Sequence, residues 1–313
     1  MFNFQNFDEV FPEDPDCCYD ANLCQAITSN KKKMQGLFIE KVMKDIGIKR
    51  PPKLYPPKDN DTLRNLHKEV IKSNSPEQHK ISILYYVLLH LDAPTGRTDQ
   101  STNFARSTFM PEMYQITMNG FWHMDQMEFE NAIEYLTHPS LIPTYCEDIL
   151  EILARNSKDD HRLALAYYHT VKPALTNKSS TECLFVAIAG VSVTEAFHFS
   201  RAQAPNTHRH TFEMLISLAI HNSPAETVAD RSVELVNLPM SAEEEEWFEE
   251  YLLHGDGTRL KKAKDTVLFR RMATGKFTES LAVKPSNSRS ISGLDWSSLA
   301  RGVESGLGPR MNV

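Results

Sequence analysis

The sequence predicts an all-α protein, and three observations carry that prediction. The stretch EFENAIEYLTHPSL places apolar residues at i, i+3, i+4 and i+7, the spacing of one helix face: Phe129, Ala132, Ile133 and Leu136. Alternating Val, Ile and Thr patterns, which are typical of strands, are nearly absent. A similar helix then returns about every 32 residues, which indicates a repeated helical unit.

The repeat is marked by an alanine followed by a large apolar residue, at Ala132, Ala164 and Ala196. A leucine of a second helix, with an acid-apolar-Leu pattern, follows each alanine by 18, 20 and 19 residues: Leu150, Leu184 and Leu215. Helix pairs of this length cannot cover their own apolar faces, so neighbouring pairs stack. We therefore expect an α-solenoid-like stack of helix pairs. The alternative is an irregular bundle of helices of equal length.

Apolar spacing, capping residues and breakers place the individual helices in chain order. The predicted ranges are 31–46, 60–73, 76–91, 111–122, 125–137, 145–155, 159–171, 181–190, 193–203, 208–221, 224–236, 241–253 and 258–271. Ser241 before a run of glutamates is a favourable helix start, because Ser is a preferred N-cap residue and the glutamates complement the helix dipole. A fourth, weaker copy of the alanine helix falls within 224–236.

The composition divides the chain into three parts. Residues 1–30 form an acidic N-terminal extension with scattered phenylalanines, 31–272 form the helical domain, and 273–313 form a flexible tail rich in Ser, Gly and Pro. We expect the C-terminal tail to be disordered.

Bulk properties exclude several classes of protein. With 313 residues and 41% hydrophobic composition the chain can bury a sizeable core, and its net charge of −7 argues against direct nucleic-acid binding as its main role. The N-terminus lacks the pattern of a signal peptide, and no apolar run approaches the ~18 residues of a membrane span. The expected location is the cytosol or the nucleus.

No motif supports catalysis or a cofactor. The phosphate-binding, dinucleotide-binding, serine-hydrolase and zinc-protease signatures are all missing. The five cysteines form no C-x-x-C pair, and Cys17, Cys18 and Cys24 lack the spacing of a zinc site. His208 and His210 stand two apart, which on a helix makes a poor metal pair, so we expect them at the surface. We predict no enzyme activity, no bound cofactor and no metal site.

Two neighbouring helices carry opposite charge. The helix at 241–253 is acidic, and the segment 258–271 has an apolar stripe and six basic residues. Antiparallel charge pairing within the chain is the favoured interpretation. A phosphate-binding face or a nuclear-import signal is the alternative, and the sequence leaves open whether 258–271 binds nucleic acid.

One apolar cluster stands out in the tail, within SGLDWSSLARGV. Its members are Leu294, Trp296, Leu299 and Val303. Two helical turns would bring the last three onto one face, although Gly302 weakens such a helix. The cluster is a candidate partner-binding site that folds on its target. The alternatives are that it packs against its own domain or has no role.

Several segments together resemble a known family. They are HKISILYYVLLHLD (79–92), FMPEMYQITMNGFWHMDQMEFENAIEYLTHPSLIP (109–143), LALAYYHTVKPAL (163–175) and SVTEAFHFSRA (192–202). This succession resembles the ELYS-like domain of fungal nuclear pore proteins, over about residues 31–271.

The resemblance implies a non-enzymatic nucleoporin at the nuclear envelope that docks on the Y-shaped outer-ring subcomplex of the pore and supports pore assembly. Animal members of the family also have a β-propeller and a DNA-binding AT-hook, whereas this sequence has neither propeller strands nor a Gly-Arg-Pro core. It has no Phe-Gly dipeptide either, which excludes a barrier-forming nucleoporin. The remaining alternatives are a generic α-solenoid adaptor outside the pore, as in vesicle coats or chaperone assemblies, and an unrecognised enzyme. The contacted subunit, the docking face and the copy number are not encoded in any motif.

Overall fold

The computed structural model describes residues 2–11, 19–95, 99–156, 161–221, 225–280, 283 and 296–306. Over these residues the chain is helical and contains no strand, which confirms the all-α prediction. No helix in this part of the chain is long and apolar enough to cross a membrane. The chain forms two compact units: the first is Met1–Ser157 with Arg162–Ala174, and the second is Lys158–His161 with Leu175–Val313.

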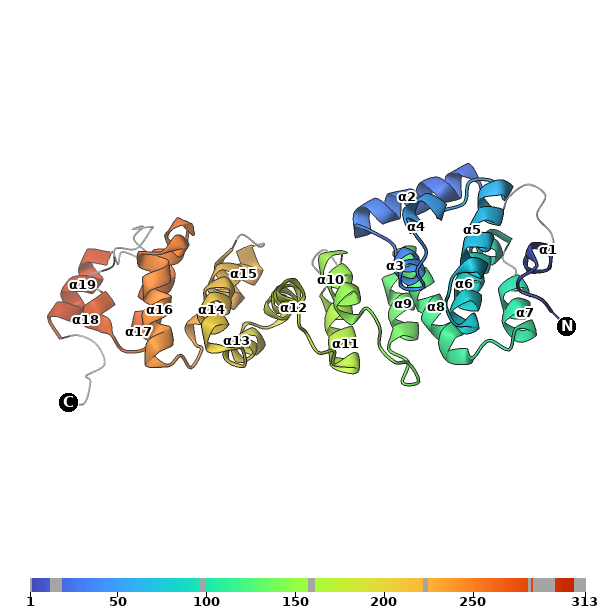
Figure 1. The fold of residues 1–313 in the computed structure, drawn as a ribbon. Coiled ribbons are helices and arrows are strands. Elements are labelled where there is room, and N and C mark those ends of the chain that lie inside the picture. The colour runs from blue at the N-terminus through green and yellow to red at the C-terminus, as the bar shows by residue number, and fades with distance from the viewer. Residues whose placement is uncertain are drawn as a thin grey trace. The chain divides into compact units, whose positions relative to one another are not determined.

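The first unit contains helices α1 to α11 (Figure 1). Their bounds are α1 Phe7–Val10, α2 Ala21–Met34, α3 Phe38–Asp45, α4 Pro51–Leu54, α5 Asn60–Lys72, α6 Glu77–Thr95, α7 Asp99–Ser107, α8 Glu112–Asp125, α9 Phe129–Leu136, α10 Cys146–Asn156 and α11 Arg162–Val171. Helix α6 lies at the centre and contacts α3, α5, α7 and α8. Its apolar residues are buried on several faces, from Ile81 to Leu88, as expected of a helix surrounded by others.

The second unit contains α12 to α19. Their bounds are α12 Lys178–Val191, α13 Val193–Arg201, α14 Pro205–Ile220, α15 Ala225–Val236, α16 Ala242–Leu253, a 3₁₀ turn η1 Asp256–Arg259, α17 Ala263–Ala273, α18 Phe277–Ser280 and α19 Trp296–Glu304. From α12 to α17 almost every helix packs against the next one and the one after it. This makes two layers, α12–α14–α16 and α13–α15–α17, the arrangement of a stack of helix pairs (Figure 1).

The marker residues of the repeat lie in the core. Ala132, Ala164 and Ala196 are fully buried in α9, α11 and α13, and so are the leucines of the partner helices, Leu150, Leu184 and Leu215. The boundary between the units falls between α11 and α12. The recurrence therefore marks the packed faces of helices in both units, as the 32-residue spacing predicts.

Two parts of the repeat prediction need correction. In α9 only Ala132 and Leu136 are buried, while Phe129 and Ile133 are half-buried. In the fourth copy, within 224–236, Ala229 stands where Ile133 stands in the first copy, and it is exposed. In α15 the burial falls instead on Leu235 and Val236.

The N-terminal helices also differ from the prediction. The range 31–46 is interrupted because Gln35 is left-handed, with φ of 60°, and Gly36 has φ of 140°, a region that favours glycine. Helix α2 begins at Ala21, where the Asp20 side chain accepts the Leu23 N–H at 2.6 Å. The expected boundary at residue 31 therefore lies inside a helix.

Helix α7 is absent from the predicted set, because its sequence DQSTNFARS is mostly polar. Its start is stabilised from outside the helix: the Asp92 carboxylate accepts the backbone N–H groups of Gln100 and Ser101 at 3.2 and 3.0 Å. Phe104 and Ala105 then bury one face of α7. The residue that caps this helix, Asp92, thus stands seven residues before its start.

Candidate docking groove

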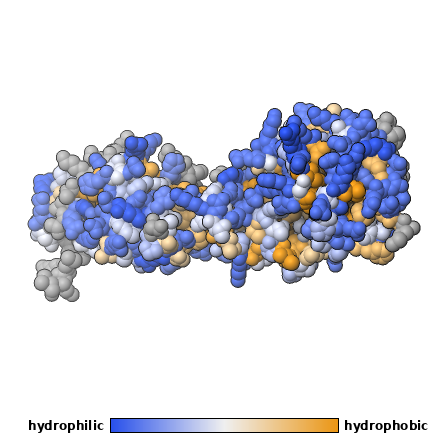
Figure 2. All heavy atoms as spheres, viewed as in Figure 1, coloured by the Kyte–Doolittle hydropathy of each residue, from blue (hydrophilic) through white to orange (hydrophobic). Residues whose placement is uncertain are grey.

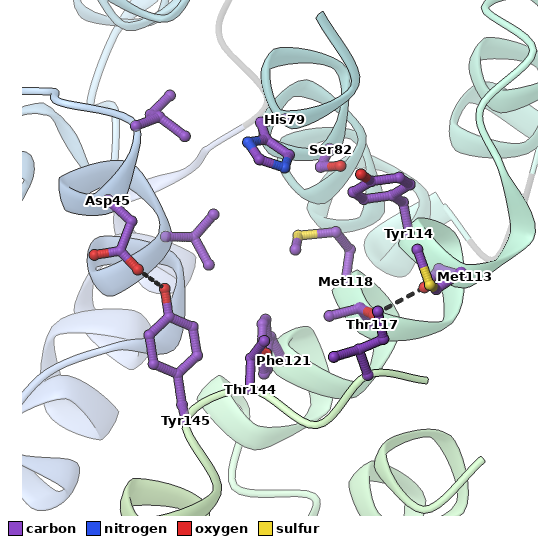
Figure 3. Close-up of a pocket in the computed structure, with 13 residues that line it drawn as sticks. Asp45, His79, Ser82, Met113, Tyr114, Thr117, Met118, Phe121, Thr144 and Tyr145 are labelled. Atoms are coloured by element: carbon purple, nitrogen blue, oxygen red, sulfur yellow. Dashed lines mark hydrogen bonds between the residues drawn. The ribbon is translucent and has the colours of Figure 1, made fainter. Parts of the chain in front are cut away.

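The first unit contains a groove of about 350 Å³ between three helices and the loop that leads into α10 (Figure 3). Helices α3, α6 and α8 and the loop each contribute to its lining: Val42, Asp45, Ile46, His79, Ser82, Met113, Tyr114, Thr117, Met118, Phe121, Ile142, Thr144 and Tyr145. Most of these side chains are apolar, and Ile142 is 76% exposed at the rim. Apolar residues also gather over α3 and α6 on the face seen in Figure 2. Such a groove suits an apolar side chain of a partner protein.

One wall of the groove is held in an unusual backbone conformation. Tyr145 has φ of 52°, which is uncommon for an aromatic residue. Its ring packs against Phe121, with ring centroids 5.6 Å apart, and its hydroxyl donates a hydrogen bond to the Asp45 carboxylate (Figure 3). Contacts to α3 and α8 therefore fix Tyr145 in place.

The polar groups of the groove do not form a catalytic arrangement. Burial, followed by the bond to Asp45, raises the pKa of the Tyr145 hydroxyl well above its usual value, so it stays protonated at neutral pH. The Ser82 hydroxyl donates to the Gln78 carbonyl at 2.7 Å instead of to a base. His79 Nδ1 lies 3.4 Å from the hydroxyl of Ser75, and Ser75 does not line the groove. Nucleophile and base are thus not paired here.

A buried carboxylate joins the three helices that line the groove. Asp125, at the end of α8, accepts the backbone N–H groups of Phe38 and Ile39 at 2.7 and 3.1 Å and the hydroxyl of Tyr86 at 2.8 Å. It thereby caps the start of α3 and binds α6. Burial raises the pKa of this carboxyl to about 7, against the opposing effect of its three donors. Sequence reasoning missed Asp125, because its partners lie about 40 and 87 residues away.

Two histidines that sequence reasoning did not single out are structural. His90 is buried among aromatic rings, with Trp122 and Tyr86 at centroid distances of 5.6 and 5.5 Å. Burial lowers its pKa to about 3, so it is neutral at physiological pH. His67 is also buried and its Nε2 lies 3.0 Å from the Phe4 carbonyl, which ties the N-terminal segment to α5.

In the second unit, the predicted charge pairing between the acidic and basic helices is confirmed. Arg270 on α17 is buried and binds Glu245 on α16, together with the backbone carbonyls of Val236 and Leu238. Arg271 binds Glu249 through two hydrogen bonds, at 2.9 and 2.6 Å. Two of the six basic residues therefore stabilise the domain itself.

The start of the acidic helix is also structural. Ser241 and Glu244 form a reciprocal capping box, as the Ser241 signal predicts. Burial disfavours the charged form of Glu244, but hydrogen bonds from Arg201 and Ser241 outweigh it and lower its pKa to about 2. His208 Nε2 lies 3.2 Å from the same carboxylate, and His210 Nε2 lies 3.6 Å from Glu182. His210 is exposed as expected, whereas His208 is half-buried.

The predicted tail site falls partly outside the described residues. Leu294 lies there entirely, and the side chains of Leu299 and Val303 are not described. Trp296 is half-buried at the start of α19, which spans the two helical turns predicted for this cluster. Helix α19 contacts α18, so this part of the tail is helical and not irregular. Whether the cluster binds a partner stays a prediction.

The cysteine prediction stays open as well. Cys17 and Cys18 lie outside the described residues. The Cys24 thiol lies 3.6 Å from the Pro57 carbonyl. Among the residues that the structure describes, no three His, Cys, Asp or Glu side chains gather as a metal site would require.

Comparison with protein families decides the relationship of the chain. The model of the ELYS family, described as nuclear pore complex assembly, matches residues 36–255. The chain belongs to the ELYS family. All residues that line the groove lie within the matched range, and the resemblance inferred from the sequence motifs is confirmed.

Individual relatives agree with this assignment. The chain is 26% identical to a Schizosaccharomyces pombe protein, "Uncharacterized protein ely5", over 246 residues that make up 77% of each chain. It is also 26% identical to Protein ELYS of Xenopus laevis over 171 residues, 51% of this chain but 7% of that protein. Protein ELYS of Homo sapiens matches over 151 residues at 26% identity, 47% of this chain and 6% of that protein. Only a small part of the animal ELYS proteins is thus represented here.

Proposed function

We propose that this ELYS-family chain is a non-enzymatic nucleoporin that docks on the Y-shaped outer-ring subcomplex and supports assembly of the nuclear pore at the nuclear envelope. The observation that carries the proposal is the family match over residues 36–255, whose description is nuclear pore complex assembly. The matched range includes the whole groove of the first unit. A scaffold role also agrees with stacked helices, which offer extended binding surfaces.

The groove is the first docking surface in this proposal. Its apolar lining, its rim residue Ile142 and its fixed wall at Tyr145 suit a large apolar side chain of an outer-ring subunit. Since α3, α6 and α8 are held together by Asp125, the groove is preformed and binding requires little ordering. The tail cluster around Trp296 is a second, independent contact in the same proposal.

Binding of the purified chain to reconstituted outer-ring subcomplex, measured by size-exclusion chromatography and by interferometry, tests the proposal. Ile142→Asp places a charge at the rim without touching the core, and we expect it to weaken binding at least about tenfold. Val191→Asp is the matched control, because Val191 is also exposed but belongs to the second unit. Deletion of residues 288–313 tests the tail cluster separately.

The outcomes separate the parts of the proposal. Failure of the unmodified chain to bind any outer-ring subunit would contradict the function itself. Binding that Ile142→Asp leaves unchanged would remove the groove as docking surface, and binding that survives the deletion would remove the tail cluster. Turnover of a nucleotide by the purified chain would contradict the non-enzymatic role.

A further inference from the structure

A second groove, in the second unit, combines apolar and basic side chains. It has a volume of about 280 Å³ and lies between α15 and α17, lined by Ala229, Ser232, Val233, Val236, Lys262, Asp265, Thr266 and Phe269. Val233 is 48% exposed and Phe269 is 51% exposed. Met272, one turn beyond Phe269 on α17, is exposed as well, so the apolar strip continues along the helix.

Four basic residues lie just before and at the start of α17. Arg259, Lys261, Lys262 and Lys264 are all exposed, in contrast to Arg270 and Arg271. Within the part of the chain that the structure describes, none of these four forms an ion pair. Lys262 lines the groove directly, so its positive charge stands at the edge of the apolar surface. Arg259 and Lys261 come just before it in the chain, whereas Lys264 lies on the opposite face of α17 from the groove-lining Asp265, Thr266 and Phe269. Arg259, Lys261 and Lys262 are called the basic rim below.

We propose that the groove between α15 and α17 binds a segment of a partner protein that presents one or two large apolar side chains beside Asp or Glu residues. The apolar side chains would pack against Val233 and Phe269, and the acidic residues would lie against the basic rim. At about 280 Å³ the groove has room for one or two large side chains.

Charge indicates whether the occupant of the groove is a segment of a partner protein or a terminal segment of this chain. Residues 281–313 carry four Lys or Arg and two Asp or Glu, a formal charge of +2, which repels the basic rim. The N-terminal segment is acidic and apolar, but Phe7, Val10 and Phe11 are buried within the first unit. The complementary segment therefore comes from another protein.

A nucleic acid would use only half of the surface. Phosphates could pair with the basic rim, but they would gain nothing from the exposed strip of Val233, Phe269 and Met272. A peptide can use the apolar strip and the basic rim together, whereas a polyanion uses only the basic rim.

The test uses the full chain and two labelled synthetic helical peptides with the same leucine stripe at i, i+3, i+4 and i+7. One peptide has Glu on both flanks of the stripe and the other has Lys. Fluorescence anisotropy measures binding, with duplex DNA of equal charge and anionic vesicles as further probes. We expect the acidic peptide to bind at least about tenfold more tightly than the basic one.

Three variants assign the binding to the groove. Lys261→Glu with Lys262→Glu should abolish the preference for the acidic peptide, and Phe269→Ser should weaken binding about tenfold. These side chains are exposed, so the melting temperature should not change. Lys32→Glu with Lys33→Glu, an equal charge change on exposed residues of α2, is the matched control.

Equal binding of the acidic and basic peptides would overturn the proposal. So would equal binding of DNA or vesicles that Phe269→Ser leaves unaffected, because the rim would then bind anions without regard to the apolar strip. Failure here would not affect docking on the outer ring, which is tested at the groove of the first unit and at the tail cluster.

Discussion

Replacing Asp125 by Ala should destabilise the first unit more than any exposed substitution. The change leaves three donors without their acceptor: the backbone N–H groups of Phe38 and Ile39 and the hydroxyl of Tyr86. Each unpaired buried donor costs about 1–3 kcal/mol. Fraying of α3 lets water reach part of this site, so we expect the free energy of unfolding to fall by the lower end of the range summed over the three donors, about 3 kcal/mol.

The first unit comprises 157 residues of Met1–Ser157 and 13 of Arg162–Ala174, about 170 in all. For a domain of this size 1 kcal/mol corresponds to about 2–4 °C in melting temperature, so the expected shift is about 6–12 °C. Circular dichroism measures it. Hydrogen exchange should show loss of protection at the amides of Phe38 and Ile39.

Tyr86→Phe is the matched control, because it removes one donor and leaves two. We expect it to cost about 1 kcal/mol. A melting temperature of Asp125→Ala within about 2 °C of wild type, with the two amides still protected, would refute the argument that this carboxylate holds α3, α6 and α8 together.

Three further predictions concern other parts of the fold. Burial raises the pKa of Asp125 to about 7 from an ordinary 3.8, so between these pH values the folded state binds more protons than the unfolded state. The free energy of unfolding should therefore fall as the pH rises from about 4 to 7, and Asp125→Asn should remove this slope in denaturant titrations. Ala132→Glu should destabilise the fold by several kcal/mol, since Ala132 is fully buried, and a thermal melt within about a degree of wild type would contradict this. Arg270→Ala should cost about 3–5 kcal/mol by leaving Glu245 unpaired, whereas Lys264→Ala, at an exposed position, should stay within about 0.5 kcal/mol in the same assay.

The sequence predicted those features that depend on local spacing. The alanine and leucine markers of the repeat are buried because a helix places i, i+3 and i+4 on one face wherever it occurs in the chain. The pairing of α16 with α17 followed from opposite charge on consecutive helices. The ELYS family followed from the succession of motifs.

Features that depend on distant partners were not predictable. Helix α7 is capped by Asp92 and the start of α3 by Asp125, and neither acidic residue stands next to the helix it stabilises. The groove of the first unit is lined from four separate stretches, 42–46, 79–82, 113–121 and 142–145. Apolar spacing identifies the buried face of each helix but not the half-exposed faces that meet at such a groove.

Purification of the tagged chain from its own cells, with quantitative mass spectrometry of the associated proteins, tests the central claim most directly. The account predicts that subunits of the Y-shaped outer-ring subcomplex co-purify in amounts comparable to the chain, and that they are lost from Ile142→Asp but retained by Val191→Asp. Co-purification of vesicle-coat or chaperone components without outer-ring subunits would contradict it.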